Sequence, residues 1–234
     1  MLLSGSLLFV LTVAAFLLFG CGIALRLWSD ESGDAPHALE RVLAAVTIAV
    51  AAWLAIDWVL ALTHTLTRTV LIWRMVVVLV IGVALVVSRR RALPRVVKLS
   101  RKWLVLIVPV TLRLVFIVWR ATITPPLSHD ALSNHLPRAV LYGRLHGFED
   151  LTLLSPAFRD MPANYELLLA DIILLERHDR HTEWLSTFCY VAVLLAGGAL
   201  AWRWWRTTEV TILSTIALAA APVIHPAARS RRFR

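Results

Sequence analysis

Long runs of apolar residues dominate the chain, and short polar segments separate them. A run of about 18 or more apolar residues can cross the hydrocarbon core of a bilayer as a helix, and five or six runs meet or approach that length. The sequence therefore predicts an all-α, polytopic integral membrane protein in the cell membrane. The expected spans are 2–25, 42–63, 69–88, 103–119, 184–202 and, as the weakest, 210–224.

Composition agrees with this prediction. Of the 234 residues, 59% are hydrophobic and 17% are charged, which leaves too little polar surface for a water-soluble globule and too little charge for a disordered chain. The net charge of +9 would suit a nucleic-acid partner, but the basic residues crowd the ends of apolar runs, as they do in membrane proteins. We therefore expect no nucleic-acid partner. Cys21 and Cys189 lie within apolar runs and indicate neither a disulfide framework nor a metal site.

The positions of lysine and arginine predict the orientation in the membrane. Segment 89–102 carries a cluster of cations and no acid, and such loops lie on the cytoplasmic side. The expected organisation is three spans in 1–88, this cytoplasmic loop in 89–102, a fourth span in 103–120, an extracytoplasmic loop in 121–182, and a fifth and weaker sixth span with a basic tail in 183–234. The cations of the loop are Arg89, Arg90, Arg91, Arg95, Lys98, Arg101 and Lys102.

The extracytoplasmic loop 121–182 has the composition of a functional site, because it is rich in acids and prolines. A loop of this length is expected to contain helices of its own. The pattern predicts short amphipathic helices on the membrane surface over 139–145 and 164–175. In the second helix, one face is shared by Leu167, Leu168, Ile172 and Leu175.

The string S-H-D-A-L-S-N-H-L-P-R, residues 128–138, holds the strongest candidate chemistry. It follows the fourth span directly, so the Asp130 carboxylate is expected at the boundary between lipid and water. On spacing alone, a helix N-cap is favoured over a catalytic role for Asp130. His129 and His135 have no third ligand at a suitable spacing, so we assign no metal site to them.

The same string resembles the first outer loop of GT-C superfamily membrane glycosyltransferases, in the branch of the protein mannosyltransferases and aminoarabinose transferases. The chain departs from that pattern at Asn134, where tyrosine is common, and at Ala131, where a second acid is frequent. These departures leave the use of a divalent metal open. The residues that carry the resemblance are Asp130, His135, Leu136, Pro137 and Arg138, followed by Pro162, Tyr165 and Glu166.

The resemblance implies transfer of a sugar, with inversion, from a polyprenyl-phosphate-linked donor to a glycan, lipid or protein acceptor. Asp130 matches the loop aspartate that takes the proton of the acceptor hydroxyl as general base. His135 and Arg138 match the string, and we expect them to contact the phosphate or sugar of the donor, since the forked donors of arginine suit phosphate. The family usually has more spans, so we expect this chain to be the N-terminal portion of such an enzyme. No cofactor is required by the sequence.

Charged residues inside or beside the spans add further expectations. Asp57 and Arg74 lie at similar depth in the second and third spans and are predicted to pair across that hairpin. Arg113, near the middle of the fourth span, is expected to line a cavity below Asp130 and to contact the donor. Glu166 is expected to meet the acceptor, although a helix start also favours an acid there.

Other interpretations stay open beside the glycosyltransferase. Segment 176–183 has His178 and His181 three residues apart, but no third ligand is fixed by spacing, so we interpret it as a solvated entry to the fifth span. The whole chain is also compatible with a non-catalytic membrane protein, either truncated or an assembly subunit. A small transporter would use Asp57, Arg74 and Arg113, but paired interrupted helices, typical of transporters, are missing from the sequence pattern.

Overall fold

The computed structural model is all-helical in the part of the chain that it describes, residues 4–27, 38–88, 101–123, 131–148, 163–179 and 181–220. Four of its helices are long and apolar enough to cross a membrane. This confirms the prediction of an all-helical chain with apolar helices of membrane-spanning length. The four are α1 (Gly5–Leu27), α2 (Ala38–Leu62), α3 (Arg68–Val87) and α8 (Glu183–Trp205).

Two further helices correspond to the other predicted spans. α4 (Arg101–Ile123) has 23 residues and covers the fourth predicted span. α9 (Thr208–Ala220) has only 13 residues, which is fewer than a helix needs to cross the hydrocarbon core. The weakest predicted span is therefore a short apolar helix in the described residues.

Segment 121–182 contributes a π-helical turn, η2 (Ala131–His135), and the helices α5 (Leu136–Leu145) and α7 (Asn164–Glu176). Pro137 lies in the first turn of α5, a position that favours proline, and η2 runs directly into this turn. His146 directly follows α5 and Arg177 directly follows α7, both with left-handed backbone conformation (φ 59° and 65°). Each of these residues stops its helix and turns the chain sharply.

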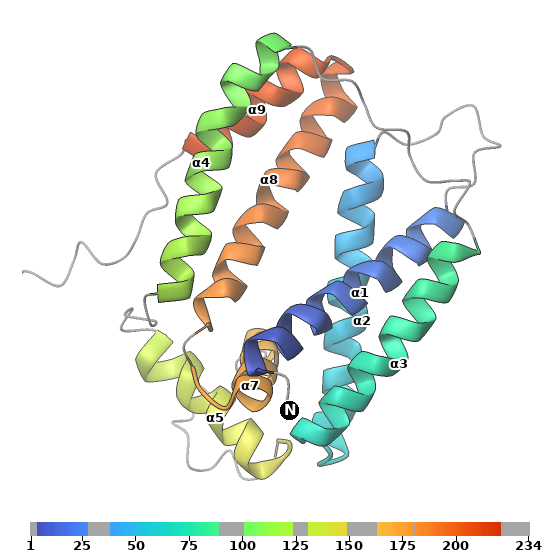
Figure 1. The fold of residues 1–234 in the computed structure, drawn as a ribbon, viewed down its shortest axis with the longest axis vertical. Coiled ribbons are helices and arrows are strands. Elements are labelled where there is room, and N and C mark those ends of the chain that lie inside the picture. Colours follow the sequence, from blue (N-terminus) through green and yellow to red (C-terminus); the bar gives the residue numbers. More distant parts are fainter. Residues whose placement is uncertain are drawn as a thin grey trace, which may run out of the picture.

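The spans pack into two groups, which meet where α2 lies against α8 (Figure 1). In the first group α1 lies against both α2 and α3. Gly82 allows a close approach there, because a Cβ atom at this position would lie 2.8 Å from the Phe19 backbone nitrogen of α1. Small residues serve the same purpose at other helix interfaces in membranes. In the second group α4 contacts α8 and α9.

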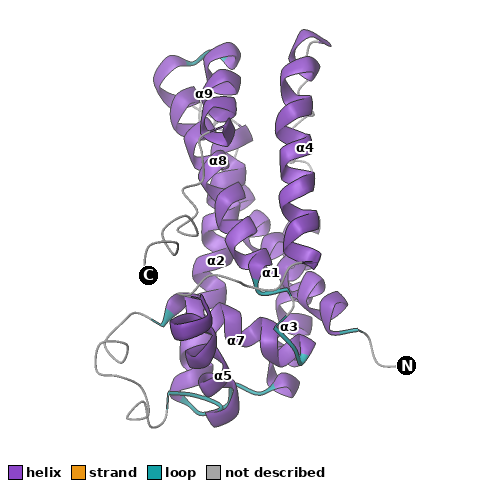
Figure 2. Cartoon of the chain, turned by 90° about the vertical axis from the view of Figure 1, so that its left-hand side faces the viewer, coloured by secondary structure: helices purple, strands orange, loops and turns teal. Residues whose placement is uncertain are grey.

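The sequence colouring in Figure 1 shows that successive long helices run in opposite directions, and hydrogen bonds join helix termini at both ends of the bundle. At one end Arg26, from the end of α1, donates to Ser88, just after α3, at 2.8 Å. At the other end the Trp184 indole, from the start of α8, donates to Thr122, near the end of α4, at 3.2 Å. α5 and α7 lie at this second end (Figure 2). The helix directions match the predicted order of spans, and the side of the membrane at each end stays a prediction.

α7 differs from the amphipathic surface helix that the sequence predicts. Leu167, Ile172 and Leu175 are fully buried, but Glu166 and Asp171 are buried as well. The helix packs against α1, α2, α3 and α5, so protein covers it on almost every side. The prediction assumed that lipid headgroups would cover its apolar face, whereas the ends of the spans provide that cover.

Candidate functional site

Three of the residues predicted to contact substrate meet at one carboxylate oxygen. The Nδ1 atom of His135 lies 3.0 Å from Oε1 of Glu166. Arg138 donates to the same oxygen at 2.9 Å through one guanidinium nitrogen. The contact joins the start of α5 to the start of α7, which are separated in the chain by residues outside the described part. The structure therefore brings together the two segments that carry the predicted motif.

Arg138 and Glu166 are buried, whereas His135 is partly exposed. Arg138 is 1% exposed and Glu166 is 2% exposed, so each neutralises the other away from water, as a buried ion pair requires. This pairing gives Arg138 a positioning role between α5 and α7. The expected contact between Arg138 and a phosphate stays a prediction, and it would require the guanidinium to leave Glu166. The His135 side chain is 29% exposed and packs edge-on against the Tyr165 ring, so it is the member that a ligand can reach.

Tyr142 completes the buried part of this cluster. Its hydroxyl oxygen accepts a hydrogen bond from the second terminal nitrogen of Arg138 at 3.1 Å. Burial raises the pKa of the Tyr142 hydroxyl above its ordinary value, so the group remains neutral at physiological pH. A neutral, buried hydroxyl next to a guanidinium fixes the direction of the arginine fork.

Replacing Tyr142 with phenylalanine is expected to lower the free energy of unfolding by about 1.5–3 kcal/mol, because a buried hydrogen bond to a charged group is lost. Thermal or denaturant unfolding in detergent measures this change. The matched control is Tyr165→Phe, since the Tyr165 hydroxyl bonds Ser186 at an exposed position, at 3.2 Å. The control is expected to lose less than about 1 kcal/mol. Equal losses in the two variants would contradict the role of Tyr142.

The other two predicted site residues are Asp130 and Arg113. Asp130 lies outside the described residues, directly before η2 in the sequence. Arg113 is half-buried in α4, which packs mainly against α8 and α9. At 1.5 Å per residue it lies about 15 Å along the helix from Ile123. Contact between Arg113 and the donor stays a prediction.

The predicted pair of Asp57 and Arg74 is present, and a third residue joins it. Arg74 of α3 bonds Asp57 of α2 with one nitrogen and Asp171 of α7 with the other. Trp53 also donates to Asp171, at 2.7 Å. Both carboxylates are fully buried, so two acids share one guanidinium inside the bundle. We call Asp57, Arg74 and Asp171 the buried triad.

Sequence analysis missed Asp171, although the chain carries a signal for it. Asp171 is the single acid in the apolar run 167–175. An acid in such a run needs a cationic partner when the run is buried. The triad therefore anchors α7 between α2 and α3, and its charges are engaged with each other rather than lining a path.

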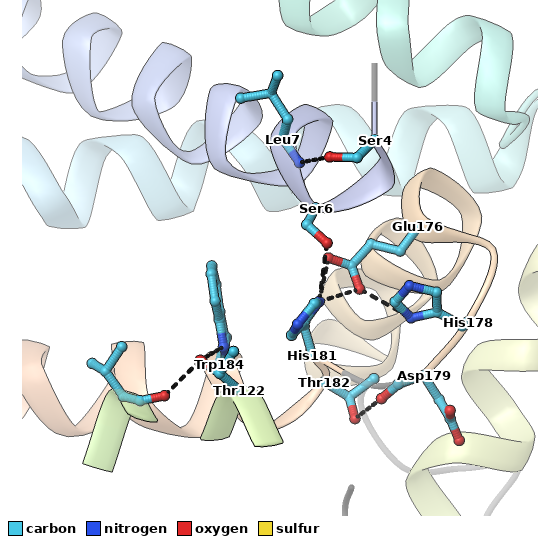
Figure 3. Close-up of polar contacts among 11 residues, drawn as sticks. Ser4, Ser6, Leu7, Thr122, Glu176, His178, Asp179, His181, Thr182 and Trp184 are labelled. Carbon is cyan, nitrogen blue, oxygen red and sulfur yellow. Dashed lines mark hydrogen bonds and ion pairs between the residues drawn. The ribbon is translucent and has the colours of Figure 1, made fainter. Parts of the chain in front are cut away.

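A second group of polar side chains lies where α7 ends and α8 begins (Figure 3). Nδ1 of His181 is 2.9 Å from each oxygen of Glu176, and Nδ1 of His178 is 3.4 Å from Oε2 of the same residue. The Ser6 hydroxyl of α1 lies 3.3 Å from Nδ1 of His181. The interpretation of this segment as a simple solvated helix entry is therefore wrong, because Glu176 and His181 are buried. We call Glu176, His178 and His181 the turn cluster.

No protein-family model, curated protein or solved structure matches this chain. Function is therefore inferred from the residues and their geometry. The geometry offers a partly exposed histidine beside a buried ion pair, and a separate group of two histidines and a carboxylate.

Proposed function

We propose that the chain is a GT-C-like membrane glycosyltransferase that moves a sugar from a polyprenyl-phosphate-linked donor to an acceptor at the outer face of the cell membrane. The observation that carries this proposal is the meeting of His135 and Arg138 with Glu166. These residues belong to the two segments whose sequence resembles the family's outer loop. Their contact lies at the end of apolar helices, which supports a site for a lipid-linked substrate.

In this proposal Asp130 is the general base. It takes the proton from the acceptor hydroxyl while the hydroxyl oxygen attacks the anomeric carbon of the sugar. The bond from that carbon to the phosphate oxygen breaks, and the polyprenyl phosphate leaves with the electron pair, so the configuration is inverted. The leaving group is an anion, and its charge must be stabilised by donors placed beside it.

The described residues supply the surroundings of this reaction. His135, which is accessible and lies five residues after Asp130 in the sequence, donates a hydrogen bond to the departing phosphate. Arg138 and Glu166 hold α5 against α7 and so fix the position of His135. Oε2 of Glu166 is buried and has no hydrogen-bond partner among the described residues, so the proposed contact of Glu166 with the acceptor requires α5 and α7 to open at this point. Arg113 lines the path of the donor within the bundle.

The proposed orientation follows from the basic segment 89–102. This segment joins the end of α3 to the start of α4, and cation-rich loops lie in the cytoplasm. η2, α5 and α7 lie at the opposite end of the bundle (Figure 2), which supports an extracytoplasmic site in this proposal. In this arrangement α4 crosses the membrane together with the four apolar helices.

A transfer assay tests the proposal. The full chain in lipid nanodiscs is mixed with radiolabelled polyprenyl-phosphate hexoses and pentoses and with a membrane extract as the source of acceptors. We expect the chain to bind one donor and to release its polyprenyl phosphate faster than empty nanodiscs do. The proposal is wrong if the chain neither binds any of these donors nor releases polyprenyl phosphate from them. The chain would then be a non-catalytic membrane protein, in which the pair of Arg138 and Glu166 only holds α5 against α7.

A further inference from the structure

The turn cluster lies outside the proposed sugar-transfer site, and its members are arranged as metal ligands. One ligand atom from each of Glu176, His178 and His181 lies within 4.8 Å of the other two. The Glu176 side chain is fully buried and the His181 side chain is 10% exposed, whereas the His178 side chain is 46% exposed. Glu176 and His181 therefore form the buried part of the site, and His178 lies at its solvent-facing rim.

We propose that the turn cluster binds a zinc ion. Zinc takes imidazole nitrogen and carboxylate oxygen at about 2.0–2.2 Å, so ligand atoms around a tetrahedral ion lie about 3.3 Å apart. The distances from Glu176 to His178 and His181 are 3.4 Å and 2.9 Å. The Glu176–His181 contact opens slightly to admit the ion, and the exposed His178 side chain adjusts within the 4.8 Å that encloses the three ligand atoms. Two histidines, one glutamate and a water molecule at the open position form a typical zinc ligand set.

The backbone holds the two histidines in place without an ion. Arg177 ends α7 with φ 65°, and this left-handed turn directs the chain back toward Glu176. The backbone nitrogen and the hydroxyl of Thr182 both donate to the Asp179 carbonyl, at 3.2 Å and 2.8 Å. The Trp184 backbone nitrogen donates to the His181 carbonyl at 3.0 Å. The ligands are thus arranged by the fold before binding, which reduces the entropic cost of binding a metal.

An ion bound at the turn cluster would link several helices. Glu176 is the last residue of α7, and His181 comes two residues before α8 begins. α1 also reaches the cluster, because Gly5 packs directly against the Glu176 backbone and Ser6 contacts His181 (Figure 3). Zinc would therefore join α7 to α8 beside α1, at the end of the bundle that holds α5.

Zinc binding is measured on the full chain in detergent, produced with a purification tag that lacks histidine and stripped with a chelator. Titration with ZnCl₂ in competition with a chromophoric chelator gives the stoichiometry and affinity. We expect one zinc ion per chain. Loss of an outer-shell partner costs about 10–100-fold in metal affinity, so His178→Ala, which removes a ligand, should cost at least 100-fold. Co²⁺ in place of zinc should give the visible absorption of a tetrahedral site.

The matched control is His64→Asn, which removes an exposed histidine far from the cluster in the chain. His64 has a left-handed backbone conformation (φ 54°) that asparagine tolerates. This control should bind zinc as the parent does, and zinc should raise the melting temperature of the parent and of His64→Asn but not that of His178→Ala. Because His178 is at the rim, His178→Ala should melt like the parent when no zinc is present.

The proposal is overturned if the parent binds no stoichiometric zinc, or if His178→Ala binds it as tightly as the parent. In that case the cluster is a hydrogen-bonded contact between histidine and glutamate that closes the turn. Zinc binding is read from metal content and affinity, so its failure leaves the proposed sugar transfer untouched. Failure of the transfer assay likewise leaves the zinc measurement valid.

Discussion

Replacing Asp130 with asparagine is expected to lower the rate of sugar transfer by about 10²–10⁴-fold, the range that a general base contributes. An amide has nearly the same shape as a carboxylate, but it cannot take the proton of the acceptor hydroxyl at neutral pH. The loss should appear in kcat, while the dissociation constant of the donor stays close to that of the parent. Single-turnover transfer and donor binding, measured on the same nanodisc samples, separate the two effects.

The matched control for this variant is Glu209→Gln, which makes the same change from acid to amide at an exposed position in α9. We expect it to transfer sugar at the rate of the parent. If Asp130→Asn and Glu209→Gln turn over equally, another group takes the proton and the assignment of Asp130 as base is wrong.

Replacing Arg74 with leucine is expected to lower the free energy of unfolding by about 3–5 kcal/mol, the cost of removing one partner from a buried ion pair. Leucine keeps the position apolar, but it leaves the carboxylates of Asp57 and Asp171 buried together without a cation. Reversible unfolding in mixed micelles of detergent and SDS measures the change. Asp171→Asn should cost less than Arg74→Leu, because the pair of Arg74 with Asp57 remains.

Arg203→Leu is the matched control for the triad variant. Arg203 lies 3.4 Å from Glu40, and its side chain is 70% exposed, so this surface pair contributes at most about 1 kcal/mol. Losses of similar size in Arg74→Leu and Arg203→Leu would show that the buried triad does not hold the bundle together.

The long helices could be predicted from the sequence because their signal is local. The expected segments 69–88 and 184–202 agree closely with α3 and α8, which cover Arg68–Val87 and Glu183–Trp205. An apolar run of this length has few structural alternatives. The pairing of Asp57 with Arg74 was also predicted, because the hairpin fixes the two side chains at similar depth. The assignments of Asp130 and Arg113 stay predictions.

The surroundings of α7 could not be predicted, because they depend on contacts between distant segments. The apolar pattern of 164–175 indicates a helix but does not say whether lipid or protein covers it. Glu166 was expected to meet an acceptor, and its partner Arg138 comes 28 residues earlier in the chain. Glu176 was missed as a neighbour of His178 and His181, because its contact with them depends on the left-handed turn at Arg177, and helical spacing rules do not describe that turn.

The buried triad also bears on the order in which the bundle is assembled during synthesis. Chains emerge from the ribosome beginning at the N-terminus, so Asp57 and Arg74 can meet before Asp171 has been made. The early hairpin of α2 and α3 then enters the bilayer as a charge-balanced unit. The second acid is added only when α7 docks, which makes docking of α7 the late step that completes assembly of the first group of helices.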